Sequence, residues 1–156
     1  MSSPGDSDDP CGADRRRQFA RVWLAADAAT AARVRAELDG WLRTHVAADA
    51  ARVNDVLLAV YEGLANVAEY AYLGYPTPGT VDVKAHLDCD AGALTVTVTD
   101  YGHWQSPRLD SSDPAHRLRG RGIPLMKALA NDASIRTTTA GTQVRLTWNG
   151  LGRPPS

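Results

Sequence analysis

From about residue 49 to residue 73, apolar side chains recur every three or four positions along this chain. That spacing, at about 100° per residue, gathers them on one face of an α-helix. Asp49 is a suitable N-cap for this helix, and Gly74 is a suitable stop. A helix with one apolar face has to bury it against a second layer. The apolar face holds Val53, Val56, Leu57, Val60, Leu64, Val67 and Ala71, and the opposite face carries Asp55, Glu62, Asn66 and Glu69.

The second layer is predicted to be a β-sheet, because five other segments alternate apolar and polar residues as strands do. Turn residues join the last four segments into two antiparallel hairpins. Two further helices are expected, at 28–46 with Asp27 as N-cap and at 122–130, and the stretch 104–119 is expected to be a loop of lid length. This order predicts an α+β fold, a two-layer α/β sandwich whose mostly antiparallel sheet carries its helices on one face. The strand segments are 18–24, 81–87, 94–99, 134–138 and 142–148.

The chain of 156 residues fits one domain, expected at 18–149 between a disordered tail at 1–17 and a frayed tail at 150–156. A net charge of -1 gives no general electrostatic reason to bind nucleic acid or a membrane surface. No apolar run approaches the roughly 20 residues that span a bilayer. The N-terminus is polar and acidic rather than signal-like. A cytoplasmic location is therefore expected.

Two polar residues of the long helix stand one turn apart and point the same way. The carboxylate of Glu62 could take a proton from an attacking hydroxyl or water. The side-chain oxygen of Asn66 could help hold Mg2+, a hard ion that prefers oxygen ligands. The alternative is that both residues simply belong to the solvated face of an amphipathic helix.

Three glycine-containing motifs follow in the sequence. Asp100, at the end of a predicted strand, could accept a hydrogen bond from the exocyclic amine of adenine, and Gly102 would let the base approach the backbone. Gly120-Arg121-Gly122 opens a predicted helix, where free N–H groups favour phosphate. Gly141-Thr142 begins the last strand. A turn, a hinge and a hairpin would also explain these motifs, but together with Glu62 and Asn66 they predict an ATP site.

With these motifs in this order, the chain resembles the GHKL ATPase superfamily, and within it the small bacterial anti-sigma-factor serine/threonine kinases. The resemblance covers about Phe19 to Trp148, and its most specific stretch runs from Gly120 to Met126. It implies a Bergerat-type ATP-binding fold with ATP and Mg2+ as cofactors. It also implies a role for each site residue: Glu62 as general base, Asn66 as Mg2+ ligand, Asp100 as reader of the adenine amine, Gly102 and Thr142 beside the base, and Gly120, Arg121, Gly122 and Ile123 at the phosphates.

The resemblance further implies partners. Members of this group usually hold a sigma factor inactive and phosphorylate a STAS-type anti-sigma-factor antagonist, so that transcription is regulated by partner switching, and they are often homodimers. Two other functions stay open. Trp104 stands where the family pattern Asp-x-Gly-x-Gly has its second glycine, which favours a non-catalytic module that binds nucleotide and sequesters a partner. The other is a stand-alone ATPase module of histidine-kinase type that acts on a separate histidine domain.

Overall fold

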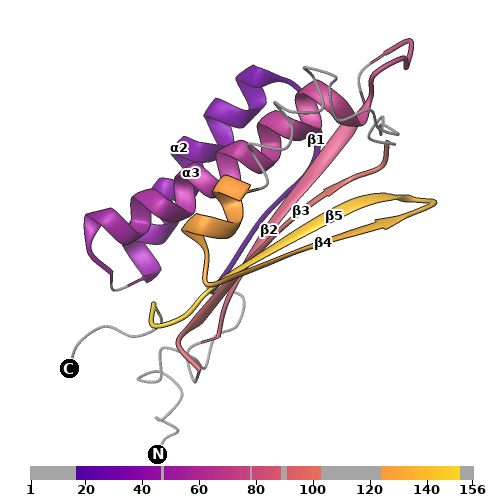
Figure 1. Cartoon of the computed structure of the whole chain (residues 1–156). Helices are drawn as coiled ribbons and strands as arrows, with labels where there is room; N and C mark the ends of the chain where they lie inside the picture. The colour runs from indigo at the N-terminus through magenta and orange to yellow at the C-terminus, as the bar shows by residue number, and fades with distance from the viewer. Residues whose placement is uncertain (1–16, 47, 78, 89–90, 103–123, 152–156) are drawn as a thin grey trace, which may run out of the picture.

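The computed structural model describes residues 17–46, 48–77, 79–88, 91–102 and 124–151. Its strands form one sheet in the order β1-β2-β3-β5-β4, with every neighbouring pair antiparallel. Helices α2 (Ala28–His45) and α3 (Ala50–Asn66) and a short helix at 124–129 cover one face of the sheet (Figure 1). The expected α+β sandwich is therefore confirmed. The strands are β1 (Gln18–Ala25), β2 (Thr80–Asp88), β3 (Ala93–Asp100), β4 (Asp132–Thr138) and β5 (Gly141–Trp148).

Both long helices begin where the sequence places an aspartate cap. The carboxylate of Asp27 accepts a hydrogen bond of 2.8 Å from the N–H of Thr30. In the same way, Asp49 accepts one of 2.9 Å from the N–H of Arg52. Each bond satisfies a backbone donor that the first helical turn leaves without an intrahelical partner. The two predicted helix starts are confirmed.

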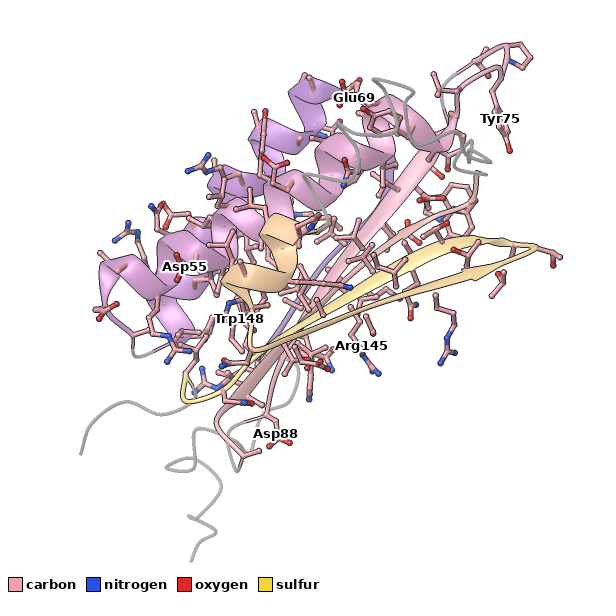
Figure 2. All side chains as sticks on the ribbon, viewed as in Figure 1. Asp55, Glu69, Tyr75, Asp88, Arg145 and Trp148 are labelled. Carbon is pink, nitrogen blue, oxygen red and sulfur yellow. The ribbon has the colours of Figure 1, made fainter. Side chains whose placement is uncertain are left out.

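The two faces of the sheet differ in polarity. Alternate residues of β3 and β5 point toward the helices and are buried, and the residues between them are polar, as the period of two in a strand requires. Arg145 projects from the polar face, on the side away from the helices (Figure 2). The buried set consists of Leu94, Val96, Val98, Val144, Leu146 and Trp148, and it packs with α3 residues that include Val56, Val60 and Leu64.

The long helix is not α-helical as far as the sequence predicts. Its α-helical part ends at Asn66, and a π-helical segment, η2 (Val67–Ala71), carries the chain on to Tyr72. Gly74, the expected stop, has a φ of +83°. A π-turn holds one more residue than an α-turn, and such segments often occur at functional sites. The predicted extent is thus corrected: regular helix gives way to a π-turn directly after Asn66.

The ends of the described chain are joined to the sheet and helices. The side chain of Arg17 lies 2.6 Å from Nδ1 of His45 in α2. Leu151 is 1% exposed and donates its N–H to the carbonyl of Gly92, so order extends past the expected limit at residue 149. The rest of both predicted tails and the predicted lid at 104–119 lie outside the described residues. Within these residues, no helix is long and apolar enough to cross a membrane.

Candidate functional site

The Glu62–Asn66 turn of α3 is only partly the solvated surface that its spacing suggests. Glu62 is half-buried, and no hydrogen bond or ion pair joins its carboxylate to another described residue. Asn66 is 4% exposed, so the alternative that both residues belong to the solvated face of the helix is wrong for Asn66. A buried amide next to a reachable carboxylate is an arrangement that can serve a polar ligand, whereas a solvated helix face would leave both side chains in water.

Close packing at Gly63 explains how this turn comes to be covered. A Cβ at Gly63 would lie 3.6 Å from Sδ of Met126 and 3.6 Å from Cγ2 of Val98, which are ordinary contact distances. The turn therefore lies over β3 and against the helix at 124–129. That helix directly follows the predicted phosphate-binding stretch at 120–123, which lies outside the described residues. Met126 is 1% exposed and belongs to the core.

A second pair of site residues lies at the end of the sheet. Asp100 ends β3 as predicted, and it faces Thr142 of β5 across the antiparallel pair. Both side chains are buried, Asp100 with 1% and Thr142 with 3% of its surface exposed. Oδ1 of Asp100 accepts a hydrogen bond of 3.1 Å from the N–H of Gly102. Two predicted motifs that are far apart in sequence are thus brought together.

Gly102 has a steric role that its motif does not reveal. A Cβ there would lie 2.1 Å from the carbonyl oxygen of Ala71 and 2.8 Å from ring carbons of Tyr72. The carbonyl of Ala71 and the ring of Tyr72 therefore occupy the place that a side chain would take at this position. The contact also brings the end of η2 against the end of β3. As a result, Asn66 and Asp100 belong to segments that meet at the same end of the sandwich.

Two buried polar atoms at this end lack a hydrogen-bond partner among the described residues, Nδ2 of Asn66 and Oγ1 of Thr142. Leaving such an atom unpaired costs about 1–3 kcal/mol, so its presence calls for a ligand or ordered water. A 180° rotation of the Asn66 amide exchanges its nitrogen and oxygen, so the position suits either a donor to phosphate or a ligand of Mg2+. Thr142 beside Asp100 suits the polar edge of a base. The residues present therefore fit ATP with Mg2+.

Sequence reasoning missed the residues that hold the Asp100 turn in place. The hydroxyl of Tyr72 accepts a hydrogen bond of 2.9 Å from the N–H of Tyr101. The hydroxyl of Tyr101 donates to the carboxylate of Asp82 in β2, and this bond raises the pKa of Tyr101 to about 12, with partial burial adding to the effect. Asp82 also accepts a 2.8 Å bond from the N–H of Trp23, at the bulge of β1. Only the alternation of β2 hinted that Asp82 belongs to the polar face.

Comparisons with known proteins identify the family and agree with the fold. A family model described as a histidine kinase-like ATPase domain matches residues 24–148. The fold also matches the crystal structure of the RsbU and RsbW domains of Rv1364c from Mycobacterium tuberculosis, with a TM-score of 0.64 and 27% sequence identity. That match covers 88% of this chain but only 33% of the other, so this chain spans about a third of that protein's length. By its sequence match and its fold, the chain belongs to the histidine kinase-like ATPase domain family.

Proposed function

We propose that this protein binds ATP with Mg2+ and transfers the γ-phosphoryl group to a serine or threonine of a STAS-type anti-sigma-factor antagonist. In the same proposal it acts as an anti-sigma factor, holding a sigma factor inactive until the antagonist competes for it. The observation that carries the proposal is that Asn66, Asp100 and Thr142 are each buried, in segments that meet at one end of the sandwich. Two of these side chains carry polar atoms without a partner among the described residues.

The nucleotide would be bound at its two ends by different layers. Asp100 and Thr142 of the sheet would receive the adenine, with Asp100 accepting a hydrogen bond from the exocyclic amine. Asn66 of the helical layer would hold the phosphate end through Mg2+. Bound Mg2+ would neutralise developing charge on the phosphate oxygens. Gly120, Arg121, Gly122 and Ile123 are proposed to complete the phosphate site from the stretch that leads into the helix at 124–129.

Phosphoryl transfer requires little covalent chemistry from the protein. The protein has to orient the reactants and provide a proton acceptor. The oxygen of the substrate hydroxyl forms a bond to the γ-phosphorus, and the bond from that phosphorus to the β–γ bridging oxygen breaks. ADP leaves with the electron pair of the broken bond. The hydroxyl proton passes to the carboxylate of Glu62, which lies one helical turn before Asn66 and is half-buried but reachable.

The partners are proposed from the likeness to a protein with an RsbW domain, together with the sequence resemblance to anti-sigma-factor kinases. A sigma factor and a STAS-type antagonist would compete for this protein. The nucleotide bound to the protein would decide which partner binds more tightly. A homodimer and a cytoplasmic location belong to the same proposal.

Calorimetric titration with ATP and Mg2+ tests the nucleotide site. The intact protein should bind, and Asp100→Asn should weaken binding because the amide presents a donor as well as an acceptor to the adenine amine. Arg145→Gln, on the polar face of the sheet, is a matched control and should bind like the wild type. An intact protein that binds no ATP would overturn the proposal.

Incubation with radiolabelled ATP and candidate STAS-type proteins tests the transfer. Acid-stable phosphate on a serine or threonine is the expected product. Acid-labile phosphate would instead identify a histidine as the acceptor and support the module of histidine-kinase type. Nucleotide binding without transfer to any such protein would favour the non-catalytic module.

A further inference from the structure

The hydroxyl of Tyr72 joins two strands to the end of the helical layer. Tyr72 is the first residue after η2. Its hydroxyl donates a hydrogen bond of 2.6 Å to the carbonyl of Thr80, where β2 begins. The same oxygen accepts the 2.9 Å bond from the N–H of Tyr101, the residue after Asp100. One side-chain oxygen therefore fixes the start of β2 and the end of β3 relative to each other.

Two glycines leave room for the ring of Tyr72. A Cβ at Gly79 would lie 2.2 Å from its Cε1 atom. A Cβ at Gly102 would lie 2.8 Å from its Cδ1 and Cε1 atoms. Any larger residue at either position would displace the ring, so the two glycines keep its hydroxyl where it meets Tyr101. Burial raises the pKa of Tyr72, which keeps the hydroxyl protonated and able to donate.

The turn that follows Asp100 is held by two successive N–H groups. The N–H of Tyr101 donates to Tyr72, and the N–H of Gly102 donates to Oδ1 of Asp100, 3.1 Å away. These two N–H groups belong to successive peptide units that meet at Tyr101, so a change of the backbone there would disturb both bonds. The position of the Asp100 carboxylate therefore depends on the hydroxyl of Tyr72, although the two side chains come from different layers.

Tyr72 also connects the two ends of the proposed nucleotide site. Asn66 immediately precedes η2 and Tyr72 immediately follows it, so one π-helical segment separates the proposed Mg2+ ligand from the residue that holds the adenine reader. Figure 2 shows Glu69, within this segment, and Tyr75, beyond it, at the same end of the molecule.

We propose that Tyr72 is a positioning residue for adenine recognition, and that its hydroxyl sets the Asp100 carboxylate at the place where it meets the exocyclic amine. This inference rests on the proposed ATP site. The proposed role of Tyr72 differs from a general structural role because it concerns only the exocyclic amine of the base. Loss of the hydroxyl should reduce selectivity for that amine while the phosphate contacts remain.

The test compares ATP with purine riboside triphosphate, which lacks only the exocyclic amine, by calorimetry on Tyr72→Phe. We expect ATP binding to weaken about tenfold and binding of the analogue to stay within about twofold, so that the preference for ATP is lost. Tyr75→Phe is the matched control, because it removes a hydroxyl from the neighbouring exposed ring, 5.2 Å from Tyr72 between centroids, and it should keep the preference.

The outcomes separate the inference from the function on which it rests. A wild-type protein that binds neither nucleotide overturns the proposed function and, with it, the selective role of Tyr72. If the wild type prefers ATP, an unchanged preference in Tyr72→Phe, or an equal loss for both nucleotides, overturns the positioning role alone. Hydrogen exchange in the free protein gives a further readout. Exchange of the Tyr101 amide should become faster in Tyr72→Phe and not in Tyr75→Phe, and an unchanged rate in Tyr72→Phe would contradict the assigned hydrogen bond.

Discussion

Gly141 lies against the main chain of Asp100 across the β3–β5 pair, so closely that a Cβ at Gly141 would stand 2.0 Å from the Asp100 carbonyl oxygen. Its φ of +146° is also one that residues with a side chain rarely adopt. This glycine begins β5 and immediately precedes Thr142, the neighbour of Asp100 in the proposed base site. The Gly141-Thr142 motif is therefore explained by contact with Asp100, the proposed adenine reader, in addition to the hairpin turn it makes.

Replacement of Gly141 by alanine should damage both stability and the site. The new methyl group would meet backbone in an unfavourable conformation, which should cost about 2–4 kcal/mol in the free energy of unfolding. ATP binding should weaken as well, because relief of the clash requires Asp100 to move. Urea unfolding and calorimetry provide the two measurements.

Gly40 supplies the control for that substitution. It lies inside α2, and a Cβ there would meet nothing within 4 Å. Gly40→Ala should therefore stabilise the protein by about 1 kcal/mol, the difference in helix propensity, without changing ATP binding. If Gly141→Ala were as stable as the wild type, the steric argument for Gly141 would be wrong.

The parts of this fold that the sequence predicts are those set by local rules. The caps at Asp27 and Asp49 each depend on a residue three positions away. The sheet follows from the alternation of side chains, because only a period of two keeps one face apolar. The order of elements then limits the architecture to helices on one face of an antiparallel sheet.

The parts that could not be predicted depend on contacts between distant residues. Asn66 is polar and spaced like a surface residue, yet tertiary packing buries it. The reason for Gly102 lies in Ala71 and Tyr72, on another element. Residues 120–123, which carry the most specific sequence motif, lie outside the described residues, so their place at the phosphates remains a prediction.

Glu62→Gln should separate transfer from binding. The amide keeps the size of the side chain but cannot accept the hydroxyl proton, so the rate of phosphoryl transfer should fall about 100-fold or more while ATP affinity stays nearly unchanged. Asp55→Asn is the matched control, a carboxylate about two turns earlier on the same helix, and it should leave the rate unchanged. Normal transfer by Glu62→Gln would show that this carboxylate is not the base.

The bond from Tyr101 to Asp82 should be visible in a spectrophotometric titration. Because the carboxylate accepts this bond and partial burial adds to its effect, the pKa of Tyr101 is about 12, above the ordinary 10.0. The folded protein therefore holds the proton more tightly than the unfolded chain. The stabilisation from this bond is complete below pH 10 and is lost as the pH rises from 10 through 12.

Asp82→Asn should bring the pKa of Tyr101 back toward 10, because a neutral amide accepts the hydrogen bond more weakly than a carboxylate. The N–H of Trp23 can still donate to the amide oxygen, so the bulge of β1 should persist. Tyr101→Phe identifies the transition, since it removes the Tyr101 component and leaves that of Tyr72, whose pKa burial also raises. An identical titration curve for the wild type and Asp82→Asn would refute the assignment.

His45 should make the protein less stable in mild acid. Burial, followed by the charge of Arg17, lowers the pKa of His45 below its ordinary 6.5, and Nδ1 lies 2.6 Å from the Arg17 guanidinium. Above pH 6.5 the imidazole is neutral in both states and its contribution is fully present. As the pH falls through 6.5, the unfolded chain takes up the proton first, so the free energy of unfolding decreases.

Melting temperatures measured at about pH 7.5 and about pH 5.5 should therefore differ less for His45→Gln than for the wild type. Arg17→Gln should reduce the difference between the two melting temperatures without removing it, because burial is the larger cause of the lowered pKa. If the wild type and His45→Gln showed the same pH dependence of the melting temperature, His45 would be excluded as the source of that dependence.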